Sequence, residues 1–487
     1  MKDHLPEIVF SSSDSYTSQQ ITKLVKAGQL RKLFPRVYTS NHIEKDETIV
    51  RRNLWMLLSH LFPEAILSHR SALEFRLSPE GNIYLTGKQR RVYKWPGVNV
   101  RISAGRDKHP DDFQSFENLY VSSFERALLE NLVQSRTTGG EKRVLTQTKI
   151  EERLLAIMNS KGEEGINEIR DRAREIARKF GWEKTFKKLD QMIGSILSTR
   201  PGKILQSPIA MAQALGEPYD GSRMELFQNL VSELKQGNFE SRSSKTDTEI
   251  RFNLIAFFES YFSNFIEGTT FEVKEAQGII YEGKTIPNRM GDSHDIRGTY
   301  ELVQNQFEMK RIPDTAENFI DLLQKRHQAI LVGRPEKNPG VFKTKANRAG
   351  GSHFVEPRLV QGTLKYGFKL MASLTLPFER ALFMMFLVSE VHPFDDGNGR
   401  LARVMMNSEF VHGQQSKLII PTVYRDDYVL NLKRFTRQRE SSGYIRMMNR
   451  AHAFSHWLEP NTFEELEEQL LGSNAFKESA EAVLIFP

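Results

Sequence analysis

Apolar residues recur every three or four positions along most of the chain, and this spacing predicts a mainly helical protein. The pattern is clearest in the second half, over residues 249–268, 318–333, 376–391 and 401–413. Residues 341–357 instead alternate around a Gly-Gly pair, as expected of a short β-hairpin. The second half is therefore expected to be mostly α with one hairpin.

The first half changes character along its length. Thr17 or Ser18 is expected to cap a short helix that ends at Gly28 and leads into a strand-like segment. Residues 124–235 show helical spacing and no cluster of chemically active side chains, so we expect a helical middle domain. Residues 236–247 are polar and are expected to form a linker.

Composition excludes several classes of protein. The 487 residues contain no Cys, which excludes disulfides, thiolate metal sites and cysteine nucleophiles and indicates a reducing cytoplasm. The longest apolar run, residues 381–388, is far shorter than the ~20 residues of a membrane span. The first residues lack the features of a signal peptide, so no membrane association or export is expected.

The positive charge is concentrated at the front of the chain. Residues 1–110 hold 18 Lys and Arg against 10 Asp and Glu, whereas the remainder is nearly neutral. A helix, a Gly turn and a basic hairpin are typical of the back half of a winged helix-turn-helix. If this segment has that structure, five of its basic residues are expected to contact DNA phosphates. They are Lys23, Lys26, Arg31, Lys32 and Arg36.

This front segment resembles the DNA-binding region of AbiEi-type antitoxins and related regulators, over roughly residues 1–130. The resemblance implies that duplex DNA is a partner. One feature departs from the pattern, because the 16 residues before Thr17 are Ser-rich and do not predict the first helix of a helix-turn-helix. A solvated basic hairpin that packs on its neighbours is the alternative.

The sequence HPFDDGNGRLAR, residues 392–403, combines several groups suited to phosphate chemistry. A Gly-rich turn at a helix start presents free N–H groups and the positive end of the helix dipole to an anion, and two arginines three positions apart clamp neighbouring phosphates. Asp396 is a carboxylate suited to Mg²⁺, and His392 is suited to act as a general base. Together these groups predict nucleotidyl or phosphoryl transfer.

The same stretch resembles the signature of the Fic family, whose members have a mostly helical core and usually move AMP from ATP onto a Ser, Thr or Tyr hydroxyl of a protein. The resemblance implies that His392 deprotonates the target hydroxyl, that Asp396 holds Mg²⁺ and that Phe394 anchors the loop. It further implies a set of phosphate-binding residues. These are Gly397, Asn398 and Gly399 as the anion hole, Arg400 at the α- and β-phosphates, and Arg403 at the γ-phosphate.

Two neighbouring segments extend the resemblance. The hairpin matches the place of the family's flap, which holds the target segment, and the helix after the motif contributes Tyr428 to the adenine pocket. The residues assigned to the flap are Gly351, Ser352, His353 and Phe354. A packed Phe354 and an ordinary core Tyr428 are the alternatives.

Residues 263–268, SNFIEG, fit the inhibitory pattern of many Fic proteins. The resemblance implies that Ser263, Glu267 and Gly268 form a brake in which Glu267 pairs with Arg403 and removes the γ-phosphate clamp. The pattern is short, and residues 160–165, SKGEEG, fit it as well. The first match is favoured because it ends an amphipathic helix ahead of the motif.

The expected fold is mainly α, with a helical Fic core and a β-hairpin flap after a small winged-helix-like α+β domain and the helical middle domain. The expected boundaries are 1–123, 124–235, 236–247 for the linker, 248–456 for the Fic domain and 457–487 for a tail. The leading hypothesis is an auto-inhibited protein adenylyltransferase that uses ATP and Mg²⁺. Three alternatives remain open: a DNA-binding regulator whose Fic core senses nucleotide or modifies the protein itself, an enzyme that removes AMP, and a homodimer.

Overall fold

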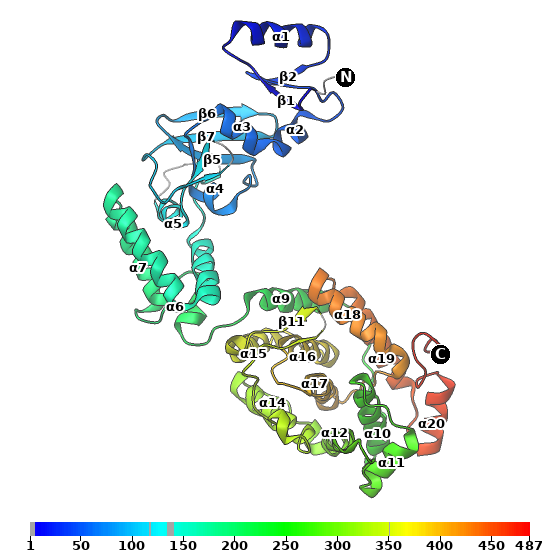
Figure 1. Ribbon diagram of the computed structural model, residues 1–487. Helices are drawn as coiled ribbons and strands as arrows, with labels where there is room; N and C mark the ends of the chain where they lie inside the picture. Colours follow the sequence, from blue (N-terminus) through cyan, green and yellow to red (C-terminus); the bar gives the residue numbers. More distant parts are fainter. Residues whose placement is uncertain (1–4, 116–117, 134–140, 350) are drawn as a thin grey trace. The chain divides into compact units, whose positions relative to one another are not determined.

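The computed structural model describes residues 5–115, 118–133, 141–349 and 351–487. The chain divides into two compact units, residues 1–216 and 217–487, each with its own hydrophobic core (Figure 1). The N-terminal unit mixes helices and sheets, whereas the C-terminal unit is helical apart from one short hairpin. The expectation of a mainly α protein with an α+β front end is confirmed.

A three-stranded antiparallel sheet opens the N-terminal unit, with strand order β1-β3-β2. Its elements are β1 Ile8–Phe10, α1 Ser15–Lys26, β2 Arg31–Phe34 and β3 Val37–Thr39. The cap of α1 is Asp14 and not the expected Thr17 or Ser18, because the Asp14 carboxylate accepts the Thr17 N–H at 2.7 Å. The helix ends just before Gly28, whose φ of +67° suits glycine.

A six-stranded mixed sheet forms the middle of this unit, in the order β6-β7-β5-β4-β9-β8. Its strands are β4 Ile66–Leu67, β5 Asn82–Gly87, β6 Arg91–Trp95, β7 Val98–Ala104, β8 Phe113–Ser115 and β9 Leu119–Val121. β5 runs parallel to β7 and β4 runs parallel to β9, so the sheet is not a simple meander.

Seven helices accompany this sheet. They are α2 Asp46–Arg52, α3 Leu54–Leu61, α4 His69–Glu74, α5 Phe124–Leu132, α6 Gln147–Phe180, α7 Glu183–Ile196 and α8 Pro208–Ala214. Leu128 of α5, Ile150 of α6 and Ile193 of α7 belong to the same buried core as Ile83 and Val100 of the sheet. The expected separate middle domain is therefore corrected, because its helices close the core of the sheet.

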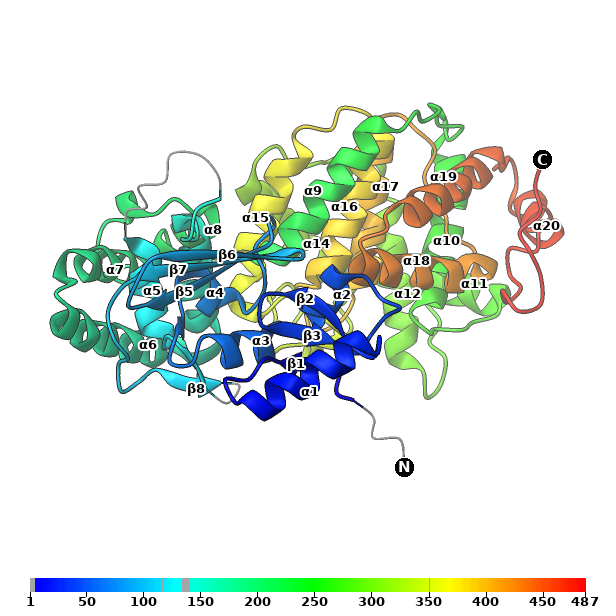
Figure 2. The same cartoon turned by 90° about the horizontal axis from the view of Figure 1, so that it is seen from above.

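The C-terminal unit contains twelve α-helices among the described residues (Figures 1 and 2). They are α9 Gly221–Gln236, α10 Glu249–Ile266, α11 Val273–Glu282, α12 Met290–Val303, α13 Gln306–Met309, α14 Ala316–Ile330, α15 Val360–Met371, α16 Pro377–Val391, α17 Asn398–His412, α18 Arg425–Gln438, α19 Ser442–Trp457 and α20 Phe463–Gly472. The hairpin strands are β10 Arg348–Ala349 and β11 Ser352–His353. α16 and α17 pack side by side in the middle of the unit, and almost all their residues are buried.

Three expected boundaries differ from the structure. α9 was expected in the middle domain, but its Phe227 packs against Phe383 and Phe386 of α16, with ring centroids 6.0 Å apart in each case. The expected linker includes Arg242, which is buried and donates to Asn449 at 2.8 Å. The expected tail includes α20, whose Leu466 and Leu470 are fully buried in the core.

In the part of the chain that the structure describes, no helix has both the length and the apolar character needed to cross a membrane.

The assignment of α9 to the C-terminal unit predicts which unfolding transition its core residue controls. Phe227→Ala should lower the stability of the C-terminal unit by about 3–5 kcal/mol, because it removes a buried ring. In differential scanning calorimetry, Phe386→Ala identifies the unfolding transition of the C-terminal unit and Met192→Ala that of the N-terminal unit. Phe227→Ala should lower the temperature of the first transition and leave the second unchanged. A shift of the N-terminal transition by Phe227→Ala would contradict the assignment.

Candidate active site

The predicted motif lies at the corner between α16 and α17. α16 ends at Val391, because His392 adopts a left-handed conformation, with φ +52°, and Pro393 follows. α17 starts at Asn398 after Gly397, which has φ +72°. The Asn398 side chain closes the loop, since its Oδ1 accepts the Phe394 N–H and its Nδ2 donates to the Phe394 carbonyl, both at 2.9 Å.

Phe394 anchors this corner in the core, as predicted. Its ring is fully buried and stacks on His327 of α14, with centroids 3.7 Å apart. His327 accepts the Gly340 N–H on Nδ1 at 2.8 Å, so its Nε2 donates to the Asp396 carbonyl at 2.9 Å. Burial lowers the pKa of His327 to about 4, and the ring is neutral at neutral pH. Sequence reasoning missed this residue, which lies 65 positions before the motif.

His392 faces a cavity of about 220 Å³. Its ring stacks on Phe354 of the flap, with centroids 3.8 Å apart, and its Nδ1 lies 3.4 Å from the Ser389 carbonyl. Because a carbonyl only accepts, the ring proton belongs on Nδ1 and the Nε2 lone pair is free. Burial lowers the pKa of His392 to about 4, so the imidazole is unprotonated at neutral pH.

The expected flap forms a short antiparallel pair in which Ser352 lies opposite Ala349. Arg437 of α18 donates to Ser352 Oγ at 3.0 Å, and Arg223 of α9 donates to the His353 carbonyl. Ser352, His353 and Phe354 line the cavity with His392, and Gly351 lies at the turn beside Arg437. Gly350, the other glycine of the expected turn, lies outside the described residues.

Two residues before the flap tie it to the motif, and neither was predicted. The Asn347 side chain donates to the Phe394 carbonyl at 3.0 Å and accepts from Lys343 Nζ at 2.6 Å. The Lys343 N–H donates to the Pro393 carbonyl at 3.0 Å. Burial lowers the pKa of Lys343 to about 8. The hairpin and the corner between α16 and α17 are thus one hydrogen-bonded assembly.

Arg403 is held by hydrogen bonds and an ion pair to the end of α10. Its Nε donates to Ser263 Oγ and its Nη2 to the Ser263 carbonyl, both at 2.9 Å, while Nη2 also contacts Glu267 Oε1 at 2.6 Å. The expected Glu267 to Arg403 pair is therefore present. Gly268 follows with φ +93° and ends the helix. The other match to the pattern lies inside α6, where Glu164 is exposed and forms no ion pair with any described residue.

The Glu267 carboxylate lies directly over the start of α17. A Cβ placed on Gly399 would meet Glu267 Oε1 at 2.2 Å, so a larger residue there would displace the carboxylate. Tyr428 of α18 is buried and lines the same cavity as Arg403 and Glu267. The first N–H groups of α17 have no acceptor within the helix, so this end attracts an anion. In this structure the anion is a carboxylate of the chain itself.

Arg400 contacts protein groups rather than solvent. It pairs with Asp295 of α12 at 2.8 Å, and Asp295 also pairs with Arg334 at 2.9 Å. The sequence did not predict this pairing, since Asp295 lies more than 100 residues earlier. Arg400 is nearly fully buried, and a paired carboxylate is what a buried guanidinium requires.

Asp396 offers one carboxylate to a cation. Its Oδ1 accepts the Gly397 N–H at 2.7 Å, and Oδ2 lies 3.4 Å from Lys337 Nζ. Burial opposes ionisation, but the Gly397 N–H and the charges of Arg400 and Lys337 keep the pKa of Asp396 below its usual value. Within the described residues there is no cluster of three acidic or His side chains. The site therefore fits Mg²⁺ that takes its other ligands from phosphates and water.

The predicted DNA-binding residues lie on α1 and the β2-β3 hairpin. Lys23, Lys26, Lys32 and Arg36 are exposed. Arg31 differs, because it pairs with Asp46 and donates to the Asn41 carbonyl at 2.8 Å. It therefore holds the hairpin on the following segment, and DNA binding by this face stays a prediction.

Part of the C-terminal unit is similar to known proteins. Residues 319–409 match the model of the Fic/DOC family. Over 177 residues the chain is 27% identical to protein adenylyltransferase fic-1 of Caenorhabditis elegans, a match that covers 34% of each chain. The chain thus spans about a third of the length of that curated relative. Residues 319–409 are thus similar to the Fic/DOC family, and the matched segment is distantly similar to a protein adenylyltransferase.

Two solved structures are also similar. Fic-1 from Caenorhabditis elegans, residues 134–508, is 18% identical with a TM-score of 0.35, covering 67% of this chain and 92% of that one. IbpAFic2 covalently tethered to Cdc42 is 13% identical with a TM-score of 0.30, covering 65% of this chain and 99% of that one.

The hydrogen bonds of Asn398 predict a stability cost. Asn398→Ala leaves the buried Phe394 N–H without its partner, at about 1–3 kcal/mol, while the Phe394 carbonyl keeps the bond from Asn347. Urea denaturation of the C-terminal unit should show this loss, while Asn431→Ala, a control on the surface of α18, should change stability by less than about 0.5 kcal/mol. Equal effects of the two variants would mean that Asn398 does not hold the corner.

Proposed function

We propose that the C-terminal unit transfers AMP from ATP to a hydroxyl group of a protein, and that its own Glu267 restrains the reaction. The observation that carries the proposal is the shared cavity. It brings a neutral histidine and an arginine at a helix N-terminus into one space, which is what an attacking hydroxyl and a polyphosphate require.

His392 supplies the general base. With its Nδ1 proton donated to Ser389, the Nε2 lone pair is available to accept the proton of the attacking hydroxyl. Its low pKa keeps the ring unprotonated, and the stack on Phe354 fixes the plane of the ring. The transferred proton therefore goes to a ring that is already positioned.

The start of α17 supplies the phosphate site. Gly399 allows close approach to the helix end, Arg403 lines the cavity, and we assign Arg403 and Arg400 to balancing the charge of the triphosphate. Asp396 would hold Mg²⁺, which supplies charge neutralisation between phosphates when bound. The AMP moiety is transferred when the target oxygen forms a bond to the α-phosphorus and pyrophosphate leaves.

Glu267 competes with the substrate for the same charges. Its carboxylate lies over Gly399 and is paired with Arg403, so a γ-phosphate placed there would meet a negative charge and an occupied guanidinium. The Glu267 carboxylate and the γ-phosphate would bind the same guanidinium of Arg403, which is buried and must keep one anionic partner. Only one of the two can therefore be bound at a time. ATP would then bind with its triphosphate out of place.

The flap is suited to hold an extended target segment. β11 has one hydrogen-bonded neighbour among the described strands, so a peptide could add to its other edge. Since His353 and Phe354 lie beside His392, a Ser, Thr or Tyr in that segment would reach the base.

Removal of the base provides the first test. In a Glu267→Gly background, His392→Ala should reduce incorporation of α-labelled ATP into protein by roughly 10²- to 10⁴-fold or more, because the group that accepts the hydroxyl proton is removed. Affinity for ATP should be nearly unchanged. His412→Ala is the control, since His412 is exposed at the end of α17. Full labelling by His392→Ala would exclude the proposed reaction.

Release of the brake provides the second test. Glu267→Gly should raise AMP transfer, including self-modification, well above wild type, and adding Arg403→Ala should cancel the gain because the freed arginine is then missing. The double-mutant cycle should be strongly non-additive. Glu164→Gly, at the second match to the pattern, should have no effect. Additive effects, or unchanged activity of Glu267→Gly, would show that residues 263–268 are only a helix end.

A further inference from the structure

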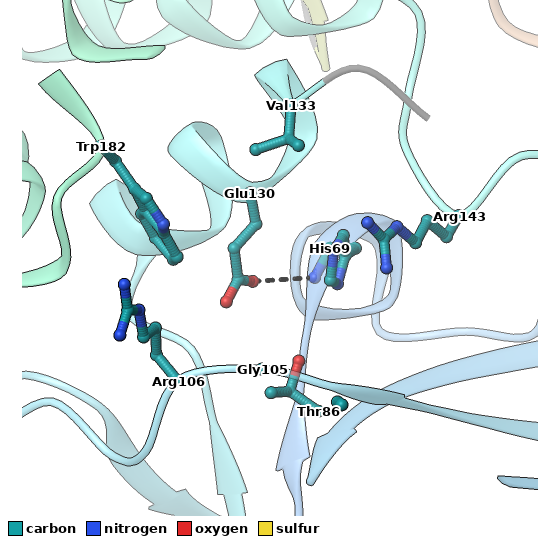
Figure 3. Close-up of a pocket in the computed structure, with 9 residues that line it drawn as sticks. His69, Thr86, Gly105, Arg106, Glu130, Val133, Arg143 and Trp182 are labelled. Carbon is teal, nitrogen blue, oxygen red and sulfur yellow. Dashed lines mark hydrogen bonds between the residues drawn. The ribbon is translucent and has the colours of Figure 1, made fainter. Parts of the chain in front are cut away.

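A second cavity, of about 460 Å³, lies in the N-terminal unit and has no role in the proposed transfer reaction. Figure 3 shows Trp182 and Arg106 on one side of it and His69 and Arg143 on the other, with Glu130 between them. Its size is that of a small-molecule site. The charges on its wall indicate what kind of molecule it accepts.

The carboxylate in this cavity is already neutralised. Glu130 accepts the His69 N–H and Arg126 Nε at 2.9 Å each, and Ser122 Oγ at 3.1 Å. Arg126 is fully buried and also pairs with Asp112. Glu130 therefore holds the wall together and offers no free negative charge to a cation.

Two arginines on the wall lack a carboxylate partner among the described residues. Arg106 donates to the Phe180 carbonyl at 3.0 Å, and Arg143 donates to Ser103 Oγ at 3.2 Å. Both guanidinium groups keep further N–H donors, because each has five and these neutral contacts use one. Two uncompensated positive charges facing one cavity favour a ligand with two negative charges.

His69 adds a neutral donor in a constrained conformation. Its φ of +53° is unusual for a non-Gly residue and is held by the bond from its N–H to Glu130. Thr86 donates to Ser68 Oγ at 2.8 Å, and Ser68 Oγ lies 2.9 Å from His69 Nδ1. When the Ser68 hydroxyl donates to Nδ1, the ring proton is on Nε2. Burial, with the charges of Arg143 and Arg126, lowers the pKa of His69 to about 3, so the ring stays neutral.

The remaining wall is apolar and includes a large flat ring. Trp182 faces the cavity (Figure 3), whose lining also includes Val133, Ala104 and Gly105. At Gly105 a Cβ would meet Thr86 Cγ2 at 2.5 Å, so the backbone approaches closely there. An indole face next to a guanidinium is suited to a planar ring that carries an anion.

We propose that this cavity binds a phosphate monoester joined to a planar ring, the chemistry of a free nucleoside monophosphate. The phosphate lies between Arg106 and Arg143 and accepts from His69 Nε2, and the ring packs on Trp182. The two negative charges of the phosphate balance the positive charges of Arg106 and Arg143. This explains why both arginines lack carboxylate partners, while Trp182 supplies the face on which the ring stacks.

The test uses the full chain carrying Arg403→Ala, which weakens nucleotide binding in the C-terminal unit. Isothermal titration calorimetry with AMP, GMP, CMP and UMP should find at least one that binds at one site per chain. Arg143→Gln and Arg106→Gln should each weaken that binding by about 10-fold or more. Arg90→Gln is the matched control, because Arg90 is exposed and outside the cavity; it should leave the affinity unchanged.

Further variants and probes separate the parts of the proposal. Trp182→Leu should weaken the nucleotide at least several-fold and leave the weaker binding of inorganic phosphate unchanged. Inorganic phosphate or citrate binding as tightly as the best nucleotide would overturn the role of the ring. Tighter binding of a 5′-phosphorylated DNA oligonucleotide would overturn the assignment to a free ligand. Absence of binding by all four nucleotides to a folded protein, verified by circular dichroism, would overturn the site.

Discussion

The corner between α16 and α17 is the constraint on which the rest of the C-terminal unit depends. Two left-handed residues, His392 and Gly397, reverse the chain between two buried helices, and the Asn398 side chain closes the loop on Phe394. The Asn398 side chain supplies the hydrogen-bond partners that the Phe394 backbone would otherwise find in a helix or sheet. His392, Asp396 and the N-terminus of α17 thereby keep fixed positions relative to one another.

Arg403 connects this rigid corner to the end of α10, and this contact is the brake in the proposed mechanism. It is nearly fully buried, and a guanidinium in such a place must have an anionic or carbonyl partner. Ser263 and Glu267 now supply those partners from α10. A phosphate could replace the carboxylate with little loss of pairing, which is why one arginine can serve both a closed and an open site. The balance between them depends on how easily the end of α10 moves away.

The two units use charge in different ways. In the C-terminal unit the buried arginines at the site are paired with carboxylates, as Arg403 is with Glu267 and Arg400 with Asp295. In the N-terminal unit the buried Arg126 is paired, but Arg106 and Arg143 at the cavity are not paired with any described carboxylate. Paired charges hold a structure together, whereas unpaired charges at a cavity attract a ligand. Packing alone does not require two arginines without carboxylate partners at the second cavity, whereas binding of an anionic ligand does.

The sequence by itself determined the helical class, the hairpin and the twelve-residue motif, because each depends on local spacing or on neighbouring residue types. Only the tertiary structure decided which distant groups complete the site: His327 under Phe394, Asn347 behind the flap and Asp295 against Arg400. It also joined the middle helices to the N-terminal sheet and placed α9 in the other core. Periodicity shows that a helix has an apolar face but not what covers that face, since the partner is selected by packing across long sequence separations.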